Sequence, residues 1–372
     1  MKTKFFFLFF GLAMLSCKQT DSGTDIQEIR FGAYQRFDVS GDTWTATWAD
    51  DGDIYSTVDD FYCDSVKSNL ALFRFKGDDP MNLERELINP MSEYGSICQL
   101  DRDSLAWKAS GLICVDGALY MFVSRHGYPW LYKPAPYNNR QTAEDGSIIK
   151  SLDYGKTWTR TAEENMNNPM FSGRRFASGF FIEYGKDIED TANGSDKYVY
   201  AIANDGYWNN GSDIILGRVL KTKLPDLNAR DWEFYISDGK GGMDDKSWTK
   251  DMNKAVPVLS DSSRIGMSAV TYIPHLKRYV LAQWYFPFGN FCGATAVWSF
   301  RQAPAPWGPW SEPVSNREFT DEGFYNPCIL SKFIAEDGSS SYITVAGDCN
   351  QQEKYYKLFV VPVEFLPVAE GE

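Results

Sequence analysis

The sequence lacks most of the motifs on which common enzyme classes depend. It contains no phosphate-binding loop, no dinucleotide-binding fingerprint, no His-Glu-x-x-His motif and no nucleophile elbow. These absences exclude kinase, dehydrogenase, zincin and esterase interpretations. None of the seven cysteines forms a Cys-x-x-Cys pair, which argues against a zinc site. Histidine is also scarce, with only His126 and His275 in 372 residues.

Positive charge is in short supply as well. The chain has 37 Lys and Arg residues against 50 Asp and Glu residues, which gives a formal net charge of −13. Because nucleic-acid phosphates are held by a basic face, this balance argues against a nucleic acid as partner. It does not exclude an anionic sugar, since a single basic cleft can lie on an acidic surface.

Helical patterns are nearly absent, and strand patterns take their place. Residues 162–168 form at most one short helix. Elsewhere, short apolar and aromatic stretches end at Gly, Asp, Asn or Pro turns. The Asp116-Gly117 turn between two apolar runs is a strong hairpin signal. Many short strands with frequent turns predict an all-β sandwich, barrel or propeller.

The N-terminus has the features of a targeting signal. Residues 1–17 combine two lysines, an apolar run too short to span a bilayer, and a final Leu-Ser-Cys. This ending resembles a bacterial lipobox, which implies cleavage before Cys17 and lipidation of that residue. We therefore expect a signal peptide over residues 1–16, a lipidated cysteine with a polar tether over 17–30, and a lipoprotein on the periplasmic or outer side of the outer membrane. The alternative is an ordinary signal peptide that happens to contain a cysteine.

Beyond this signal, no segment predicts a transmembrane helix, because none has about 18 consecutive apolar residues. The cell envelope permits disulfides. Cys328 and Cys349 flank one predicted hairpin, so they are the candidate disulfide pair.

One motif selects among the all-β folds. Residues 151–158, Ser-Leu-Asp-Tyr-Gly-Lys-Thr-Trp, fit the pattern S-x-D-x-G-x-T-W, the Asp-box of sialidase-like propellers. In this hairpin turn Asp153 can bond turn amides, Gly155 takes a positive φ, and Trp158 packs between blades. The resemblance implies one sialidase-like β-propeller over residues 31–372, with five to seven four-stranded blades. It also implies that the Asp-box lies on the rim away from the active face.

The order of motifs along the chain carries a wider resemblance. The motifs include WADDGDIY (48–55), KASGLI (108–113), DGALY (116–120), the Asp-box, FFIEYGKD (180–187), LGRV (216–219) and GPWS (308–311). Together they resemble a family of secreted bacterial and fungal propellers that is related to sialidase-like sugar-degrading enzymes. Related propellers include uronate-cleaving polysaccharide lyases, such as ulvan lyases and rhamnose–glucuronate lyases, and endo-D-arabinanases. The resemblance implies a polysaccharide or oligosaccharide substrate.

A cluster of acidic residues is the first candidate site. It comprises Asp50, Asp51, Asp53, Asp59 and Asp60. A glycoside hydrolase needs two carboxyl groups, one as acid and one as nucleophile or base, and Asp51 and Asp60 are the candidates. Turn formation or calcium binding is the alternative, so a structural calcium ion stays open although no cofactor is required.

The second candidate site follows a predicted apolar strand over residues 119–123. It contains Arg125, His126, Tyr128 and Trp130. β-Elimination from a uronate needs a base, a cation beside the carboxylate, and an acid for the leaving oxygen, and His, Arg and Tyr can supply them. Since histidine titrates near neutral pH, we predict that His126 is catalytic in a loop at the mouth, with the other three as substrate ligands. A structural loop histidine is the alternative.

Two further pairs of residues precede predicted strands. Arg174 and Arg175 point opposite ways on a strand, so one of them can hold a substrate carboxylate in a bidentate fork and take part in catalysis. A solvated or salt-bridged pair is the alternative. Glu322 and Asn326 precede a strand whose start resembles that of the final blade in related sugar enzymes, and we predict that both bind substrate.

The last candidate site directly follows the strand predicted over residues 197–203. It contains Asn204, Asp205, Tyr207 and Trp208. Tyr207 could donate a proton, and both aromatic rings could stack on sugar faces, with Asn204 and Asp205 as substrate ligands. An Asn-Asp-Gly turn with surface aromatic residues is the alternative.

Three functions are open at this point. The favoured one is a lyase that cleaves next to a uronic acid with the histidine, arginine and tyrosine candidates, because a generic hydrolase needs no histidine there. The second is a glycoside hydrolase that uses Asp51 and Asp60 with Glu322 or Asp205. The third is a non-catalytic glycan-binding lipoprotein.

Overall fold

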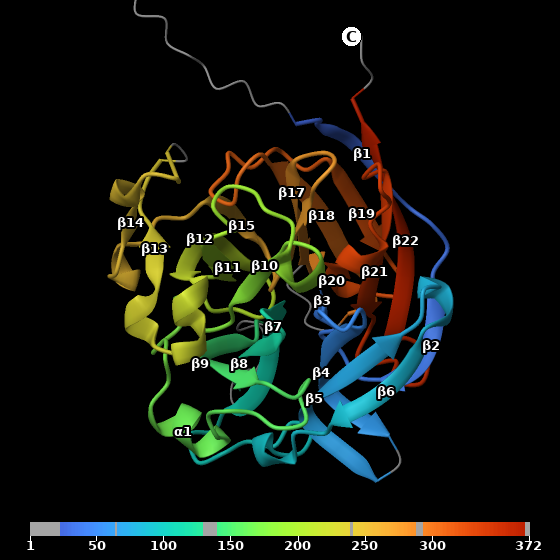
Figure 1. Ribbon diagram of the computed structural model, residues 1–372. Helices are drawn as coiled ribbons and strands as arrows, with labels where there is room; N and C mark the ends of the chain where they lie inside the picture. The colour runs from blue at the N-terminus through green and yellow to red at the C-terminus, as the bar shows by residue number, and fades with distance from the viewer. Residues whose placement is uncertain (1–22, 64, 129–139, 239–240, 288–292, 369–372) are drawn as a thin grey trace, which may run out of the picture.

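Five strands line the centre of the molecule and lie around one axis (Figure 1). They are β3 (Ala46–Trp48), β7 (Ala106–Val115), β10 (Phe180–Glu183), β16 (Ala269–Ile273) and β20 (Tyr325–Ile329). The computed structural model describes residues 23–63, 65–128, 140–238, 241–287 and 293–368. Neighbouring inner strands contact one another: β10 pairs with β16 in parallel, and the N–H of Ala46 in β3 lies 3.5 Å from the Cys328 sulfur in β20.

Each inner strand begins a blade whose strands follow one another outward in antiparallel order. The first blade continues with β4 (Ile54–Cys63), β5 (Val66–Lys76) and β6 (Glu84–Asn89), and the second with β8 (Ala118–Gly127) and β9 (Thr142–Ser151). The third continues with β11 (Tyr198–Asn204), β12 (Gly211–Leu220), β13 (Glu233–Tyr235) and β14 (Trp248–Thr249), and β15 (Leu259–Ile265) pairs with β12. The fourth continues with β17 (Arg278–Tyr285), β18 (Ala296–Ala303) and β19 (Ser315–Phe319), and the fifth with β21 (Ser340–Ala346) and β22 (Lys357–Pro367).

The fold is therefore a five-bladed β-propeller, which confirms the predicted all-β class and lies at the lower end of the predicted blade number. Helix is limited to α1 (Ala162–Asn167), after the second blade, and to short 3-10 turns in the part of the chain that the structure describes. The predicted short helix over residues 162–168 is confirmed. Within the same part of the chain, none of the helices has the length and apolar character needed to cross a membrane.

The fifth blade joins the two ends of the described chain. β1 (Ile26–Phe31) pairs with β22, with Phe31 opposite Val363. β2 (Gln35–Ser40) pairs with the same strand, with Gln35 opposite Val360. This pairing closes the ring of blades. The polar tether expected over residues 17–30 consequently ends earlier, because the residues from Ile26 onward belong to β1.

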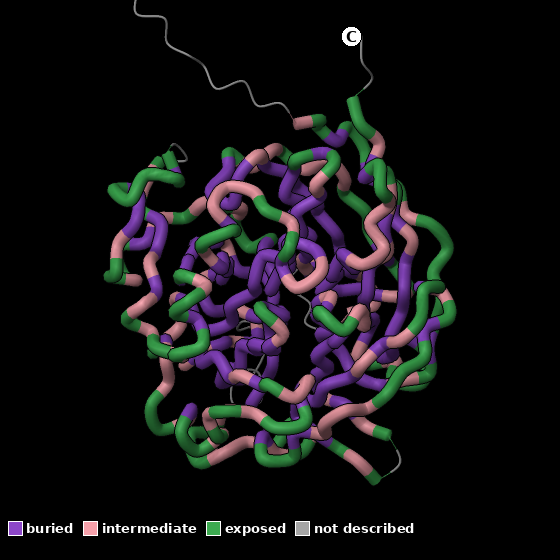
Figure 2. The backbone as a smooth tube through the Cα atoms, in the orientation of Figure 1, coloured by how far each residue is buried: buried purple, intermediate pink, exposed green. Residues whose placement is uncertain are grey.

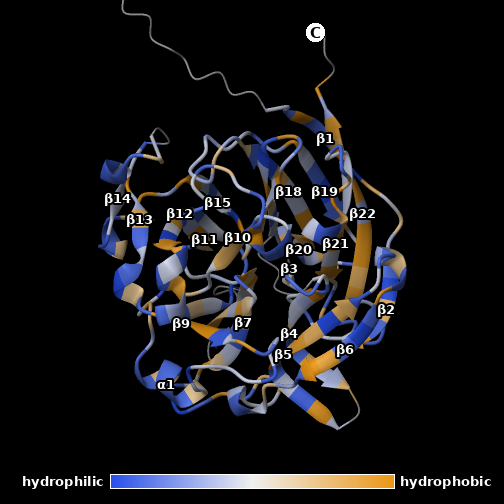
Figure 3. Ribbon diagram, in the orientation of Figure 1, coloured by the Kyte–Doolittle hydropathy of each residue, from blue (hydrophilic) through white to orange (hydrophobic). Residues whose placement is uncertain are grey.

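A continuous buried core runs through the blades (Figure 2). All ten residues of β7 and all ten of β8 are buried, and the polar Ser124, Arg125 and His126 at the end of β8 are buried with the apolar ones. Hydrophobic residues gather on such strands, and many connecting loops are hydrophilic (Figure 3). Aromatic rings also join neighbouring blades: the ring centroids of Phe122 in β8 and Phe181 in β10 are 4.8 Å apart.

The Asp-box forms the turn that the sequence predicts. Asp153 accepts hydrogen bonds from the backbone N–H of Thr157 at 2.9 Å and from its hydroxyl at 2.7 Å. Gly155 has φ +86°, and a Cβ atom there would collide with Leu72 of the first blade. The half-buried Trp158 packs against a core cluster shared by the first two blades. The motif therefore holds neighbouring blades together.

The predicted disulfide between Cys328 and Cys349 is wrong. Cys328 is a buried free thiol in β20, whereas Cys349 is disulfide-bonded. Because a cysteine forms only one disulfide, Cys349 pairs with a different cysteine. The hairpin between Cys328 and Cys349 does form, but the innermost strand places Cys328 against β3 instead, where its sulfur faces the Ala46 backbone.

Candidate active site

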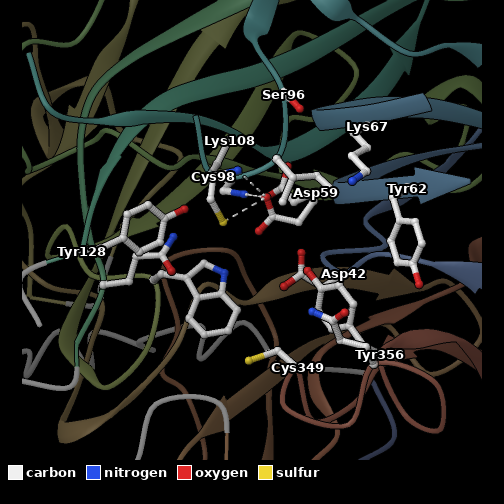
Figure 4. Close-up of a pocket in the computed structure, with 15 residues that line it drawn as sticks. Asp42, Asp59, Tyr62, Lys67, Ser96, Cys98, Lys108, Tyr128, Cys349 and Tyr356 are labelled. Atoms are coloured by element: carbon white, nitrogen blue, oxygen red, sulfur yellow. Dashed lines mark hydrogen bonds and ion pairs between the residues drawn. The ribbon is translucent and has the colours of Figure 1, made fainter. Parts of the chain in front are cut away.

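A pocket with a volume of about 840 Å³ opens at one end of the propeller. Figure 4 shows the side chains that line it. We call this end of the propeller the pocket end, because Asp42 precedes the inner strand β3 and Asp59 and Asp60 lie near the end of the second strand β4. The opposite end, with the β3–β4 turn and the Asp-box, is called the Asp-box end. The polar and aromatic residues that line the pocket include Asp42, Asp59, Asp60, Lys67, Lys108, Tyr62, Tyr128, Tyr356, Gln141 and Trp208.

Two adjacent aspartates reach the pocket because the strand that carries them is irregular. Consecutive strand residues normally point to opposite faces. Asp60 has φ +47° and is skipped by the β4–β5 ladder, which pairs Asp59 with Leu70 and then Phe61 with Ser68. Asn69 of β5 is skipped opposite Asp60, so the register is kept, and this local distortion lets the side chains of both Asp59 and Asp60 line the same pocket.

A third aspartate joins them from the segment before β3. The N–H of Asp42 donates to the Asp59 carbonyl at 2.9 Å, and the N–H of Asp59 donates back to the Asp42 carbonyl at 2.7 Å. The hydroxyl of the buried Tyr325 donates to the Asp42 carboxyl group at 2.8 Å. A backbone bridge between two segments of the first blade thus fixes Asp42 beside Asp59 and Asp60.

A buried lysine faces these carboxyl groups. Lys108, in β7, is 3% exposed, and its Nζ lies 2.5 Å from Asp60 Oδ1. Burial alone would lower the pKa of Lys108, but the charge of Asp60, with smaller effects of other nearby acidic groups, outweighs it and raises the pKa well above its usual value. The lysine is therefore a permanent cation that pairs with the Asp60 carboxylate.

The other two carboxyl groups favour the protonated state. Burial, followed by the charge of Asp60, raises the pKa of Asp42 to about 7. Burial also raises the pKa of Asp59 well above its usual value, although Lys108 opposes this. One Asp59 oxygen accepts the Ala109 N–H at 2.9 Å, and the other has no hydrogen-bond partner among the residues that the structure describes. The pocket therefore combines a carboxyl group that is paired with a cation and two carboxyl groups that can carry a proton.

Of the predicted hydrolase pair, only one member lies at the pocket. Asp60 lines it, whereas Asp51 lies in the β3–β4 turn at the Asp-box end. There Asp51 accepts a hydrogen bond from the Tyr55 hydroxyl at 2.9 Å and lies 3.2 Å from the Arg74 guanidinium. Because β4 runs from one end of the propeller to the other, it separates Asp51 from Asp60, and the two do not share a site.

The predicted mouth loop around His126 is wrong, because β8 continues to Gly127 and buries the histidine completely. The side-chain amide of Gln141 donates to Nδ1 of His126 at 2.7 Å, and Nε2 lies 2.9 Å from the Ser124 hydroxyl. Burial, followed by the charge of Lys108, lowers the pKa of His126 well below its usual value. His126 is a neutral residue behind the pocket wall and does not contact the pocket.

The other residues of that segment divide into three cases. Arg125 is 1% exposed, pairs with Asp101 and Asp103, and stacks on the Trp107 ring, so it supports β7 and β8. Tyr128 lines the pocket. Trp130 lies outside the described residues.

The two adjacent arginines also differ. Arg175 donates to the backbone carbonyls of Met252 and Ala255 and thereby holds a loop of the third blade. Arg174 donates to the Gly206 carbonyl, and its guanidinium carbon lies 4.2 Å from the centre of the Tyr207 ring. Neither arginine lines the pocket.

The turn after β11 contributes one pocket residue. Asn204 and Asp205 hold the turn itself: Asn204 donates to the Tyr207 carbonyl, and Asp205 accepts the Ser212 N–H at 3.1 Å. Trp208 lines the pocket and packs on Tyr325, with ring centroids 5.0 Å apart. Tyr207 lies at the rim, half-buried.

The two predicted ligands from the fifth blade lie away from the pocket lining. Glu322 is half-buried, and its backbone carbonyl accepts the Asp348 N–H at 2.8 Å. Asn326, in β20, is 2% exposed with φ +54°. Its side-chain amide has no hydrogen-bond partner within the described parts of the chain.

Sequence reasoning missed two residues at the centre of the pocket, Asp42 and Lys108. Lys108 carries a usable signal, since it is a lone charge in the otherwise apolar segment that forms β7. A charge inside a buried strand needs a partner, and that partner is Asp60. Asp42 carries no comparable signal, because only the backbone bridge to Asp59 brings it to the pocket. In the described part of the chain, no group of three or more His, Cys, Asp or Glu residues is arranged to hold a metal ion.

Comparison with known families matches residues 16–361 to a family described as a domain of unknown function, DUF4185. Comparison with curated proteins gives no match. A presumed hydrolase from Bacteroides ovatus ATCC 8483 has a similar structure: the TM-score is 0.54 at 12% identity, over 89% of this chain and 87% of that chain. This similarity supports the propeller fold.

Two further solved structures are similar at lower scores. The GH43 protein BlXynB from Bacillus licheniformis has a TM-score of 0.49 at 12% identity, over 89% of this chain and 54% of that chain. A GH62 hydrolase in complex with xylotriose has a TM-score of 0.45 at 10% identity, over 91% of this chain and 96% of that chain.

Proposed function

We propose that this chain, which belongs to the DUF4185 family, hydrolyses a glycosidic bond of a polysaccharide or oligosaccharide in the pocket. The observation that carries the proposal is that two carboxyl groups in the same pocket differ in their surroundings. Asp42 has a pKa of about 7 and can hold a proton, while Asp60 is paired with the Lys108 cation. One protonated and one ionised carboxyl group are what glycoside hydrolysis requires.

The roles follow from these states. Asp42 donates its proton to the glycosidic oxygen as the bond to the anomeric carbon breaks. The Asp60 carboxylate acts on the anomeric carbon, either as a base toward water or as the nucleophile, and water supplies the hydroxyl group of the new reducing end. Lys108 pairs with Asp60 and orients it. Tyr62 and Trp208 provide aromatic surface in the same pocket, which suits the faces of sugar rings.

The lyase hypothesis has less support than the hydrolase hypothesis. Its predicted base, His126, is 0% exposed and bonded to Gln141 and Ser124, so it has no contact with a sugar in the pocket. Its predicted acid, Tyr207, lies outside the pocket lining. A binding protein without catalysis has no need of buried carboxyl groups whose charges must be compensated.

Incubation with a panel of plant and algal polysaccharides tests the proposed function. New reducing ends without ultraviolet-absorbing unsaturated sugars are expected, since hydrolysis adds water across the bond. Unsaturated products would overturn the hydrolase proposal in favour of a lyase. Binding of a polysaccharide with no product of either kind would favour a glycan-binding protein.

We further propose that the protein is an outer-membrane lipoprotein, held at the membrane by lipid on Cys17. The lipobox-like ending of residues 1–17 supports this proposal, and these residues lie outside the described structure. Substitution Cys17→Ser removes the lipidated thiol and is expected to shift the protein from the membrane fraction to the soluble fraction. Retention of the variant in the membrane fraction would contradict the anchor. Cys63→Ser, which leaves the signal intact, is the matched control.

A further inference from the structure

Two arginines flank one tyrosine ring beside the pocket. The guanidinium carbon of Arg140 lies 3.8 Å from the centre of the Tyr207 ring, and that of Arg174 lies 4.2 Å from it. All three residues are half-buried. We call them the Arg–Tyr–Arg cluster. Cations over an aromatic ring are attracted by its electron-rich face, so the ring holds both guanidinium groups in place.

The cluster lies directly against the pocket wall, between the second and third blades. Gln141 follows Arg140 in the chain, Trp208 follows Tyr207, and both Gln141 and Trp208 line the pocket. The two segments are joined, because the N–H of Trp208 donates to the Gln141 carbonyl at 2.8 Å. A glycan that extends from the pocket on this side therefore reaches the cluster.

Neither guanidinium group of the cluster is neutralised by an ion pair within the described parts of the chain. Other arginines in the same protein are neutralised by carboxylates; these include Arg125, Arg218 and Arg301. The charges of the cluster do act on Glu144 and Asp205, but burial outweighs this effect and raises the pKa of both carboxyl groups. Residues 129–139, which precede Arg140, contain no Asp or Glu. Glu144 and Asp205 thus lie near the cluster but form no ion pair with it, so both guanidinium groups stay available for an anion on a protein with a net charge of −13.

Among the residues that the structure describes, most hydrogen-bond donors of the cluster have no acceptor. Arg174 donates to the Gly206 carbonyl through Nε at 3.3 Å and Nη2 at 2.7 Å, and Arg140 donates to the Asn210 carbonyl through Nη1 at 3.2 Å. A guanidinium group has five N–H donors, and these bonds to backbone orient it without consuming the rest. The geometry is that of a site prepared for an anion.

We propose that the Arg–Tyr–Arg cluster binds an oxyanion of the glycan, a carboxylate or a sulfate group, at a subsite next to the pocket. This inference rests on the proposed function, because it assumes a glycan in the pocket. Guanidinium groups match such oxyanions in geometry and charge. Since the acidic surface repels an anionic glycan elsewhere, the cluster also fixes the direction in which the chain lies.

Binding is best measured by calorimetry on an Asp60→Asn background, so that probes are not consumed. The probes are oligogalacturonides and their methyl esters, and sulfated carrageenan oligosaccharides and their desulfated forms. We expect one charged probe to bind at least about tenfold more tightly than its neutral counterpart, as charge-assisted hydrogen bonds would provide. A preference for the oligogalacturonide indicates a carboxylate ligand, and a preference for the sulfated oligosaccharide indicates a sulfate ligand.

Single substitutions Arg140→Gln and Arg174→Gln are each expected to remove most of this preference and to leave the binding of neutral probes unchanged. Arg317→Gln is the matched control, because Arg317 also lies over an aromatic ring, at 4.9 Å from the Phe319 ring centre, but on the outer strand β19. Rising salt should weaken the binding of the charged probe.

The proposal is overturned if charged and neutral probes do not differ, including the case in which none of them binds. An equal loss of preference in Arg317→Gln would overturn it as well. Hydrolysis is followed separately on the wild-type protein by reducing ends. Hydrolysis without a preference for charged probes would contradict only the proposed anion subsite. A preference for a charged probe without hydrolysis would contradict only the proposed enzyme activity.

Discussion

The two ends of the propeller hold aspartates in opposite physical states. At the pocket end, Asp42 and Asp59 are buried, and burial raises the pKa of both. At the Asp-box end, Asp153 is only half-buried, and hydrogen bonds from Thr157 and Ser151 lower its pKa despite the opposing effect of desolvation. The same residue type is therefore a proton carrier at one end and a fixed anion at the other.

This difference separates residues that serve the fold from residues that serve chemistry. In the Asp-box, Asp153 accepts its hydrogen bonds from Thr157 within a single turn, so the carboxylate stabilises the turn that contains it. The pocket instead places two buried carboxyl groups and the partly exposed Asp60 beside one buried lysine, which is an unfavourable arrangement for stability. Unfavourable charge burial concentrates at functional sites, and this supports the assignment of the pocket end as the working end.

The largest effect is expected from the pocket carboxyl groups. Asp60→Asn removes the ionised carboxylate, and Asp42→Asn removes the proton donor. Each substitution is expected to lower turnover by about 10²- to 10⁴-fold, the scale of acid–base catalysis. Reducing-end release on the glycan that the wild-type protein cleaves is the measurement. Asp38→Asn, on the exposed strand β2, is the control for loss of one negative charge.

The pH dependence of turnover sharpens the same prediction. Because Asp42 must be protonated to act and has a pKa of about 7, turnover should fall as pH rises through about 7. Full activity of Asp42→Asn, or turnover that is unchanged between pH 6 and pH 8, would contradict its role as proton donor.

A buried carboxyl group at the Asp-box end of the inner ring tests whether a raised pKa alone indicates activity. Glu183, at the end of β10, accepts hydrogen bonds from Thr47 at 3.0 Å and Ser331 at 2.9 Å, and burial raises its pKa from 4.5 to about 8. We expect Glu183→Gln to leave turnover unchanged, because the group joins three blades and does not line the pocket.

The effect of Glu183 on stability has a defined sign. A folded-state pKa above the unfolded value means that the folded protein binds the proton more tightly, so Glu183 favours folding at low pH. Its contribution is lost as pH rises from about 4.5 to about 8, by up to about 1.4 kcal/mol per pH unit. Urea unfolding across this range should show a weaker decline for Glu183→Gln than for the wild type. Equal slopes would show that Glu183 titrates normally.

A smaller effect is expected from the Asp-box tryptophan. Trp158 packs against the core cluster shared by the first two blades but is only half-buried. We therefore expect Trp158→Ala to cost about 2 kcal/mol in the free energy of unfolding, less than a fully buried aromatic residue. Turnover of the folded protein should not change. A catalytic defect in a well-folded variant would contradict the separation of the two ends.

Local patterns in the sequence were sufficient for the fold. Residues 111–123, with the Asp116-Gly117 turn, form the buried β7–β8 hairpin because apolar runs and turn residues act over short distances. The Asp-box carried the propeller architecture for the same reason. The Cys349 disulfide could not be predicted, since its pairing depends on the distance between segments that are remote in the chain.

The site was predicted only in part, because it depends on long-range placement. Of the predicted residues, Asp60, Tyr128 and Trp208 line the pocket: Asp60 lies near the end of β4, and the other two follow the ends of β8 and β11. His126 was misplaced because the strand runs further than its apolar pattern, and a polar histidine can be buried once Gln141 and Ser124 bond it. The fold, and not the sequence around His126, brings Gln141 into hydrogen-bond contact with it.

The smallest effect is expected from Asp51, the predicted catalytic aspartate that lies at the Asp-box end. Its carboxylate pairs with Arg74, whose side chain is 29% exposed, and partly exposed ion pairs contribute little. Asp51→Asn should therefore cost less than about 1 kcal/mol in the free energy of unfolding and leave turnover at the wild-type level. If Asp51→Asn abolished turnover while Asp60→Asn did not, the working end of the propeller would be the Asp-box end. Such a result would contradict the distinction between a catalytic pocket end and a structural Asp-box end, because the catalytic aspartate would then be one that is already paired within a surface turn.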